Sequence, residues 1–272
     1  GNEHWGDYFS YILYPEFLTS RGKYNKGLWR IYYLPHQLLA YSKKHWFADS
    51  GIKMACVSKK TSDIIYSFSK RRWPVLYPPA NLDDFKNKIK KKKGVISVGG
   101  LTHEKNQEEQ IEIAKHFPNL SFNICGNSKR NPSYFKKLKE KSLNMGNVHL
   151  CPDLSFKDLQ EKVKHSEVFL NSGREDPFCM ALVEGMSAGC IPLIHDSGGV
   201  AEAVPLKELR YENKEEAIKK LRKIISLSER EKEQIRKKIK KHIQQFSEEE
   251  FIKNLFKIIN KQKINKGVFP LI

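Results

Sequence analysis

Residues 173–193 read GREDPFCMALVEGMSAGCIPL and lie between two apolar runs, EVFLNSG (167–173) and IPLIHDSGG (191–199). Each run is typical of a buried strand, and the segment between them contains a loop followed by a helix that begins near Phe178. Strand, loop, helix and strand, joined by short connections, form the repeating unit of a parallel sheet that is covered by helices on both faces.

The same alternation of strand-like and helix-like segments fills the chain from residue 94 onward. Apolar runs predict strands, and apolar residues at helical spacing predict helices. The expected strands are 94–100, 121–126 and 148–152, the expected helices are 104–117, 132–145 and 155–166, and helices also fill the chain from about Asn213. We therefore predict an α/β fold with a doubly wound, Rossmann-like parallel sheet, which binds ligands at the carboxyl ends of its strands.

The first part of the chain has a different pattern. GIKMACVS (51–58) and WPVLYPPAN (73–81) read as strands, with a helix over 61–70 between them, and 8–15 reads as another strand. So few strands do not complete a sheet. We interpret this part as the back half of a second doubly wound domain.

The sequence thus predicts four parts. Residues 1–85 form a partial N-terminal domain, 86–93 a lysine-rich linker, 94–212 the ligand-binding domain and 213–272 a set of C-terminal helices. We expect the last of these helices to pack back on the N-terminal domain.

Composition indicates a folded chain that does not cross a membrane. It has 272 residues, of which 39% are hydrophobic, and it lacks a run of about 18 apolar residues. No charged-then-apolar leader opens it, so we expect no signal peptide and interpret Gly1 as the remainder of a tag or a trimmed chain. The five cysteines are odd in number and none has C-x-x-C spacing, which favours reduced, buried thiols and a cytoplasmic location.

The net charge of +18 favours an anionic partner: a nucleic acid, an anionic membrane face or a phosphorylated substrate. Six lysines lie within Lys86–Lys93, and a second basic zone covers Lys214–Lys241. Aromatic and basic residues also mix before residue 48, around Trp5, Trp29 and Trp46. That mixture fits peripheral contact with a membrane, and it fits equally well a domain core. The basic zones also fit solvated helix faces.

Two acids in the opening stretch need a partner. Asp176 lies in the loop before the expected helix, where free backbone N–H groups attract phosphate. Glu184 lies on an apolar part of that helix, where a carboxylate is costly unless it is hydrogen-bonded. The vicinal hydroxyls of a ribose would suit Glu184, and sugar hydroxyls would suit Asp176. No H-x-x-x-H or D-x-D spacing predicts a metal site.

These motifs resemble the GT-B glycosyltransferases of family 4, the glycosyl transferases group 1. Two acids separated by seven residues, with Pro-Phe after the first, look like the donor-site motif of that family. The resemblance extends over roughly residues 50–260, in ACVSKKTSDII (55–65), VLYPPANLDDF (75–85), SVGGLTHEKN (97–106) and FSEEEFIKNLFKII (246–259). Within the family, the resemblance is to the lipid-linked-oligosaccharide mannosyltransferases.

The resemblance implies roles for particular residues. Lys105 would contact the donor diphosphate, Asp176 would bind the transferred sugar and Glu184 the nucleotide ribose, and these three would carry catalysis. The remaining substrate-binding positions are the glycine turn Gly99 and Gly100, the base-pocket residue Gly126, Glu175, and the helix-start residues Phe178, Cys179 and Met180.

Three departures from the family pattern concern this site. Gly100 stands where the family has an arginine, and Arg174 and Lys129 are the candidates to replace its charge. The first acid is Asp176 where glutamate is usual, and the adjacent Glu175 could serve instead. The glycine-rich N-terminal loop has no counterpart, and Leu13-Tyr14-Pro15 stands where relatives read HYP.

Two histidines are further candidates near the site. His103 in the glycine-turn loop and His195 at a strand end could each act as a base, and for His195 a hydrogen-bonded structural role is the alternative.

The implied function is a retaining, metal-independent transfer of a hexose, with mannose as the nearest match. The donor would be a GDP- or UDP-linked sugar, and the acceptor a lipid-linked or other glycan at the cytoplasmic face of a membrane. No cofactor is expected. Because the front half of the acceptor-side domain has no counterpart, either the chain is truncated or a second polypeptide supplies that half. We then expect this chain alone to bind nucleotide and to transfer little sugar.

Two other functions remain open from the sequence. One is a GT-B-fold nucleotide-sugar epimerase or hydrolase. The other is a non-catalytic basic module that binds nucleic acid, although the two acids and the lack of a nucleic-acid motif favour a chain with no nucleic-acid partner.

Overall fold

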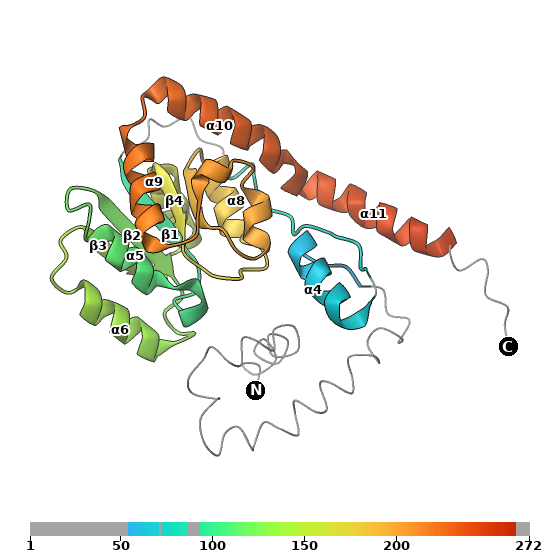
Figure 1. Cartoon of the computed structure of the whole chain (residues 1–272), viewed down its shortest axis with the longest axis horizontal. Helices are drawn as coiled ribbons and strands as arrows, with labels where there is room; N and C mark the ends of the chain where they lie inside the picture. Colours follow the sequence, from blue (N-terminus) through green and yellow to red (C-terminus); the bar gives the residue numbers. More distant parts are fainter. Residues whose placement is uncertain (1–53, 71, 86–92, 265–272) are drawn as a thin grey trace, which may run out of the picture. The chain divides into compact units, whose positions relative to one another are not determined.

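The computed structural model describes residues 54–70, 72–85 and 93–264, and its core is a six-stranded parallel sheet (Figure 1). The strands are β1 (Gly94–Val98), β2 (Ser121–Gly126), β3 (Val148–Pro152), β4 (Val168–Asn171), β5 (Ile191–His195) and β6 (Arg210–Tyr211). Their order is β3-β2-β1-β4-β5-β6, with every neighbouring pair parallel. This order confirms the doubly wound sheet. From β1 to β3 successive strands are added on one side, and from β4 to β6 they are added on the other, so the strand order reverses between β1 and β4.

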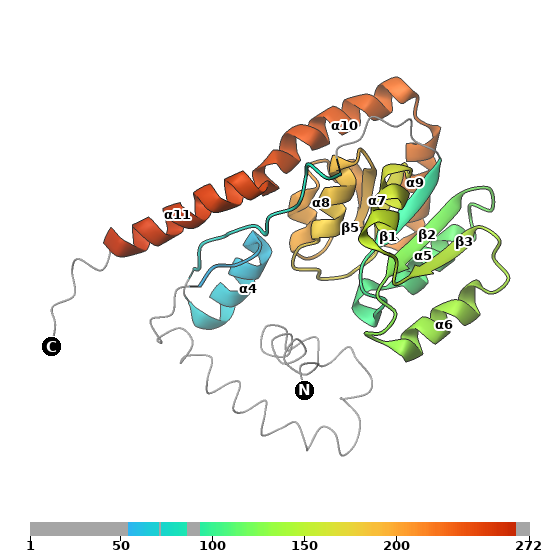
Figure 2. The same cartoon turned by 180° about the vertical axis from the view of Figure 1, so that it is seen from behind.

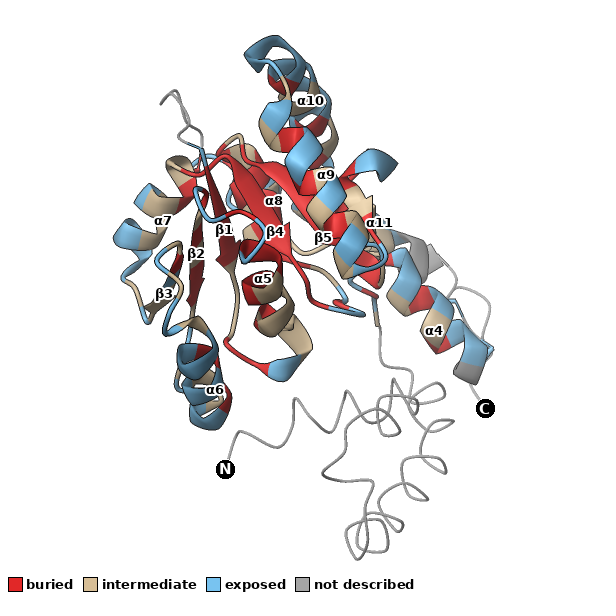
Figure 3. Ribbon diagram, turned by 60° about the vertical axis from the view of Figure 1, so that its left-hand side comes forward, coloured by how far each residue is buried: buried red, intermediate tan, exposed pale blue. Residues whose placement is uncertain are grey.

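The central strands are short, apolar and buried because helices cover both faces of the sheet. Every residue of β4 and β5 is buried, whereas the edge strand β3 is mostly half-buried (Figure 3). Val95 of β1 is in register with Phe122 of β2 and with Val168 of β4, so β1 lies between the two halves of the sheet.

Helices lie where the sequence predicted them, between the strands and after the last strand. They are α5 (Gln107–Ala114), α6 (Pro132–Ser142), α7 (Phe156–Lys164), α8 (Met180–Ser187), α9 (Lys214–Ser226), α10 (Glu229–Ile243) and α11 (Glu248–Ile264). Side chains of four residues cap the starts of α6, α7, α9 and α10 by accepting a backbone N–H: Asn131, Ser155, Asn213 and Ser228. The expected helix over 104–117 is divided, because His103–Lys105 forms a 3₁₀ turn before α5.

The helices form two layers. α5 contacts α6 and α9, and α8 contacts α10, on the two opposite faces of the sheet (Figures 1 and 2). This arrangement follows from right-handed crossovers between parallel strands. The carboxyl ends of β1 and β4 therefore lie between the helices of both layers.

The chain divides into two compact units, 1–75 and 76–272. In the first unit the described residues form helix α4 (Lys59–Ser69), which Ser58 caps, so the helix predicted there is confirmed. The strands expected over 51–58 and 73–81 are wrong for the described residues, which form a single bridge between Cys56 and Val75. Prolines at 74, 78 and 79 lack the N–H that a strand ladder needs.

The segment that precedes β1 packs within the second unit, although the sequence assigned it to the first domain. The hydroxyl of Ser187 on α8 donates to the carbonyl of Leu82 at 2.6 Å, and the Ala80 N–H donates to the carbonyl of Phe246 at 2.9 Å. Phe85 is buried in the same core as the sheet.

Several predictions lie outside the described residues: the strand over 8–15, the aromatic and basic segment before residue 48, and most of the lysine-rich linker. All five cysteines are described. They are free thiols, and four of them are buried, as expected.

Candidate functional site

The reversal between β1 and β4 places two loops side by side. The glycine turn Gly99–Gly100 follows β1, and the loop 173–178 follows β4. In a doubly wound sheet, the crevice at this point receives the ligand. Each loop supplies one charged side chain to the crevice, and these two side chains meet.

Lys105 and Asp176 form an ion pair, with the lysine Nζ 2.6 Å from the Asp176 Oδ2. The Asp176 side chain is 4% exposed and that of Lys105 30%, so the carboxylate is enclosed while the ammonium still reaches solvent. Burial disfavours the charged Lys105, but the nearby Asp176 carboxylate outweighs it and raises the pKa of Lys105. Lys105 therefore stays protonated beside the Asp176 carboxylate, at the mouth of the crevice.

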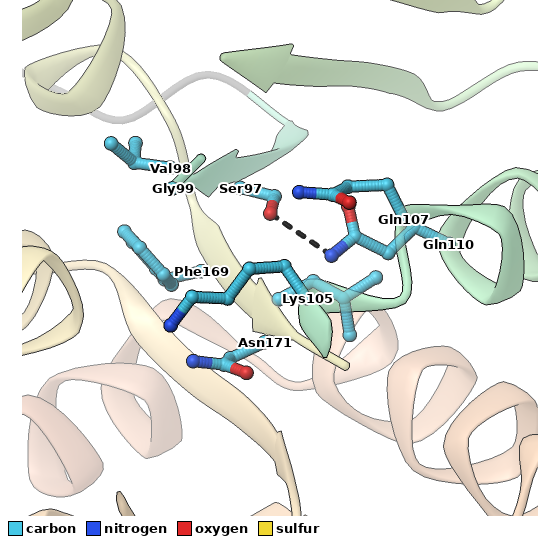
Figure 4. A pocket seen from close by; sticks show the side chains of 9 residues that line it. Ser97, Val98, Gly99, Lys105, Gln107, Gln110, Phe169 and Asn171 are labelled. Carbon is cyan, nitrogen blue, oxygen red and sulfur yellow. Dashed lines mark hydrogen bonds between the residues drawn. The ribbon is translucent and has the colours of Figure 1, made fainter. Parts of the chain in front are cut away.

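A layer of buried polar side chains beneath Lys105 fixes the two loops (Figure 4). The Gln107 side chain donates to the Gly100 carbonyl at 2.8 Å. The Gln110 side chain donates to the hydroxyls of Ser97 at 2.9 Å and Ser172 at 2.8 Å. Because Ser172 in turn donates to the carbonyl of Lys105 at 3.0 Å, β1, α5 and β4 are tied together directly below the ion pair.

A small cavity lies in this layer, between Ser97, Gln107, Gln110 and Asn171. Its volume of about 10 Å³ has room for roughly one water molecule. The cavity is therefore too small for a sugar or a nucleotide.

The loop after β4 directs Asp176 inward and Glu175 outward. Glu175 has a left-handed backbone with φ of 53°, and its N–H donates to the Ser197 hydroxyl at 3.0 Å. Gly198 packs against this loop so closely that a Cβ there would lie 2.5 Å from the Asp176 carbonyl oxygen. Of the two adjacent acids, Asp176 is therefore the one that meets Lys105.

His195 stabilises the same loop through hydrogen bonds of both its ring nitrogens. Its Nε2 donates to the Glu212 carbonyl, 3.2 Å away, and its Nδ1 lies 2.8 Å from the Ser197 hydroxyl. Since the carbonyl can only accept, Nδ1 is the nitrogen that accepts from Ser197. Burial, with Arg174 nearby, lowers the pKa of His195 and favours this neutral form. Both nitrogens are used, which favours the structural alternative for this residue. The His103 ring packs at a tilt against the ring of Tyr134, with centroids 4.3 Å apart.

Helix α8 begins beside the ion pair. Its N-cap residue, Cys179, makes no side-chain cap, and burial raises the pKa of its thiol to about 11, so the thiol is neutral there. Met180 is exposed at the first turn. The ring of Phe178 is taken up by packing against Tyr77 and Phe246, with centroids 5.8 and 5.2 Å away. The open N–H groups at this start could receive a phosphate or sugar oxygen.

Glu184 lies further along α8 and is half-buried. Burial raises the pKa of its carboxyl, a hydrogen bond from the Asn81 backbone N–H opposes that shift, and the Asp84 carboxylate adds to it. The carboxylate thus faces the segment 81–84 as well as its own helix. It makes no ion pair within the described part of the chain.

Gly126 brings the β2 loop onto the glycine turn. A Cβ at Gly126 would lie 1.8 Å from the Gly99 carbonyl oxygen, so no other residue fits without a backbone shift. The Leu101 N–H also donates to the Asn127 carbonyl at 3.2 Å. The predicted base-pocket residue and the predicted glycine turn are thus in direct contact.

The two candidates for the missing arginine charge differ in their surroundings. Arg174 is 3.3 Å from the carboxylate of Glu109, which also accepts from Tyr211. Lys129 is exposed on the loop after β2. A residue that the sequence did not single out, Arg130, is the one that lies against Gly100. Its only signal in the sequence is its place after the second strand.

The described residues gather no group of three or more His, Cys, Asp or Glu side chains of the kind that holds a metal ion. Among the helices that could be described, none combines the length and the apolar character that crossing a bilayer requires.

Known proteins resemble this chain in sequence and in fold. The mouse protein named "GDP-Man:Man(3)GlcNAc(2)-PP-Dol alpha-1,2-mannosyltransferase" is 26% identical over 203 residues, which cover 65% of this chain and 41% of that protein. The present chain thus spans less than half the length of this relative.

Two solved structures share the fold. A glycosyltransferase from Rickettsia africae superposes with a TM-score of 0.71 at 16% identity, covering 81% of this chain and 66% of that one. The Anabaena protein HepE, solved in complex with UDP, has a TM-score of 0.71 at 14% identity, covering 82% of this chain and 68% of that one. These likenesses confirm the predicted GT-B type of α/β fold.

A family profile decides the classification. The profile described as "Glycosyl transferases group 1" matches residues 80–242, more than half of the chain, and this match includes the glycine turn, the Lys105–Asp176 pair and Glu184. The chain belongs to the glycosyl transferases group 1 family.

Proposed function

We propose that this chain binds a nucleotide sugar at the β1–β4 crevice and transfers its hexose, with retention and without a metal, to a lipid-linked or other glycan acceptor. The observation that carries the proposal is the Lys105–Asp176 pair, which sets a cation and an enclosed carboxylate together at the reversal of the sheet. A diphosphate needs the cation, and sugar hydroxyls need an acceptor such as the carboxylate.

The donor would bind across the loops that follow β1, β2 and β4. Its diphosphate would approach Lys105 and the open start of α8, its ribose would approach Glu184, and its base would lie near Gly126. Asp176 would serve two purposes, because it holds the Lys105 ammonium in place and offers its carboxylate to the transferred sugar. Glu175, which is exposed and does not pair with Lys105, is the less suitable acid for that role.

In the proposed reaction the bond between the anomeric carbon and the diphosphate oxygen breaks, and the acceptor oxygen bonds to the same face of that carbon. The acceptor hydroxyl proton passes to the leaving phosphate. Negative charge grows on the diphosphate as the bond breaks, so a fixed cation at Lys105 lowers the barrier more than it lowers the energy of the bound donor.

The names of similar proteins inform the choice of substrate without deciding it. The mouse relative's name contains GDP-Man and PP-Dol, and the HepE structure contains UDP. We therefore propose a GDP- or UDP-linked hexose, mannose first. A PP-dolichol type of acceptor would place the chain at the cytoplasmic face of a membrane, where its net charge of +18 would favour peripheral contact.

Calorimetric titration of the whole chain with GDP, UDP, ADP and their sugar conjugates tests the proposal. We expect one nucleotide to bind, and Glu184→Ala or Lys105→Ala to weaken it about 10- to 100-fold, because each removes a hydrogen bond to a charged group. Lys115→Ala is the matched control, since Lys115 pairs with Glu112 on α5 and is 51% exposed.

Two outcomes would contradict the proposal. One is the absence of binding by every nucleotide diphosphate and nucleotide sugar. The other is equal loss in the Lys115→Ala control, which would indicate a general effect of charge. Product analysis of the bound sugar, without acceptor, separates a transferase from an epimerase or hydrolase, which would release epimer or free sugar.

A further inference from the structure

Gly100 leaves a space beside the glycine turn that another residue fills. An ideal Cβ at Gly100 would lie 3.3 Å from both the Cδ and the Nη1 of Arg130. The next nearest side chain, Thr102, is 3.8 Å away. The guanidinium of Arg130 thus lies where a side chain at position 100 would begin.

The chain is anchored on both sides of Arg130. Gly126 packs on the Gly99 carbonyl, and the Asn127 carbonyl accepts the Leu101 N–H at 3.2 Å, so the loop starts in contact with the turn. At its other end the Asn131 side chain accepts the Tyr134 N–H at 3.1 Å and caps α6. The backbone of Arg130 lies between these two anchored points, and its side chain extends along Gly100.

Arg130 is also a cation without an acidic partner in the part of the chain that the structure describes, and it is exposed. In contrast, Lys105 pairs with Asp176 and Arg174 with Glu109. An unpaired guanidinium can accept a new anion without breaking an existing ion pair.

The two cations flank adjacent glycines. The Lys105 side chain runs along Gly99, whose ideal Cβ would lie 3.8 Å from its Cγ and Cδ, and Arg130 lies along Gly100. The glycine turn thus has a lysine on one residue and an arginine on the next, at the carboxyl end of β1. Two separate cations at one backbone turn match two linked phosphates better than they match a single carboxylate.

We infer that Arg130 is a second diphosphate-binding cation of this site, reaching it from the loop after β2 across the space that Gly100 leaves open. The inference rests on the proposed function, because the ligand is the diphosphate of the same donor. It assigns the missing charge to Arg130, in place of Arg174 or Lys129. The guanidinium would bind phosphate oxygens through two parallel N–H donors, while Lys105 acts as a point charge.

The test compares Arg130→Ala with Lys129→Ala in the whole chain, titrated with GDP, UDP and the corresponding nucleosides. Arg130→Ala should weaken diphosphate binding at least about tenfold and leave any nucleoside binding unchanged. Lys129→Ala, which removes an adjacent exposed charge, should change diphosphate binding less than about twofold. Both variants should unfold at the parent temperature, because both side chains are exposed.

A second pair of variants moves the arginine from position 130 to position 100. In the Arg130→Ala background, Gly100→Arg should restore part of the diphosphate affinity, because the space beside position 100 is then empty. In the parent chain the same Gly100→Arg should give no gain, since its Cβ would meet Arg130 at 3.3 Å.

The results separate the inference from the proposed function. If the parent chain binds GDP or UDP and Arg130→Ala binds it equally well, the inference is overturned and the proposed function stands. If the parent chain binds no nucleoside diphosphate at all, both are overturned. Equal losses in Arg130→Ala and Lys129→Ala would also overturn the inference, because net charge would then explain them.

Discussion

At the scale of single residues, the half-buried carboxyl of Glu184 lowers the stability of the folded chain when it is charged, and the fold does not require a carboxyl there. Burial raises the pKa of its carboxyl, so the folded chain holds the Glu184 proton more tightly than the unfolded chain does. Stability from this group is present below the ordinary glutamate pKa of 4.5 and is lost as the pH rises through the raised folded pKa. At neutral pH the charged Glu184 therefore lowers stability.

Glu184→Gln tests this reading. At pH 7 the variant should unfold at the same temperature as the parent or higher, by up to about 2–4 °C, which corresponds to about 1 kcal/mol in a chain of this size. The advantage should shrink toward zero as the pH falls to 4.5. Nucleotide binding should weaken in the same variant, as for a residue kept for function at the expense of stability.

The matched control is Glu112→Gln. Hydrogen bonding to Lys115 lowers the pKa of Glu112, so this pair contributes stability above the unfolded pKa. The variant should therefore lose a little stability at pH 7. Scanning calorimetry from pH 4 to 8 measures both variants. A lower unfolding temperature for Glu184→Gln than for Glu112→Gln at pH 7 would contradict the assignment.

At the scale of elements, the strands 94–98, 121–126 and 148–152 were predictable because each is a short apolar run that ends in a turn. Strand β6 was not, since two residues carry no pattern and form a strand only because β5 lies beside them. Residues 51–58 and 73–81 have strand-like composition, but a strand also needs neighbours to pair with, and composition does not reveal whether they exist.

In the candidate site, too, some features could be predicted from the sequence and others could not. The resemblance to the family pointed to Lys105, Asp176 and Glu184, and the structure brings Lys105 and Asp176 together in an ion pair. The choice between Asp176 and Glu175 depended on a left-handed backbone at Glu175, and the neighbour of Gly100 depended on how two loops pack. Both are tertiary facts that a single sequence does not contain.

Gly185 is an element-scale prediction on helix α8. Replacing a glycine inside a helix by alanine usually stabilises it by about 1 kcal/mol. Here an ideal Cβ would lie 2.4 Å from the Cδ2 of Phe169 on β4, and Phe169 is fully buried. We expect Gly185→Ala to lower the free energy of unfolding by about 1–3 kcal/mol, because the helix must move away from the sheet.

Denaturant unfolding of Gly185→Ala and Gly146→Ala measures this effect. Gly146 is exposed, and its ideal Cβ meets nothing within 4 Å, so its substitution should be nearly neutral. Adding Phe169→Leu to Gly185→Ala should recover part of the loss by making room for the new methyl group. Equal stability of the two single variants would mean that α8 does not pack on β4 this closely.

At the scale of the whole chain, the question is whether the ligand is bound by a defined crevice or by the net charge of +18. The crevice predicts a response confined to three loops that follow β1, β2 and β4, since their strand ends converge. Net charge predicts a response spread over basic surfaces such as α10, whose sequence is EREKEQIRKKIKKHI.

Hydrogen–deuterium exchange of the full chain, with and without saturating GDP or UDP, distinguishes the two. We expect slower exchange in peptides covering 99–107, 126–131 and 173–184, because bound ligand stabilises local structure that otherwise opens. Helix α10 should exchange at an unchanged rate, because it contributes no residue to the three loops. Slowing that appears in α10 and not in the three loops would show that charge alone attracts the nucleotide, and the β1–β4 crevice would then not be its binding site.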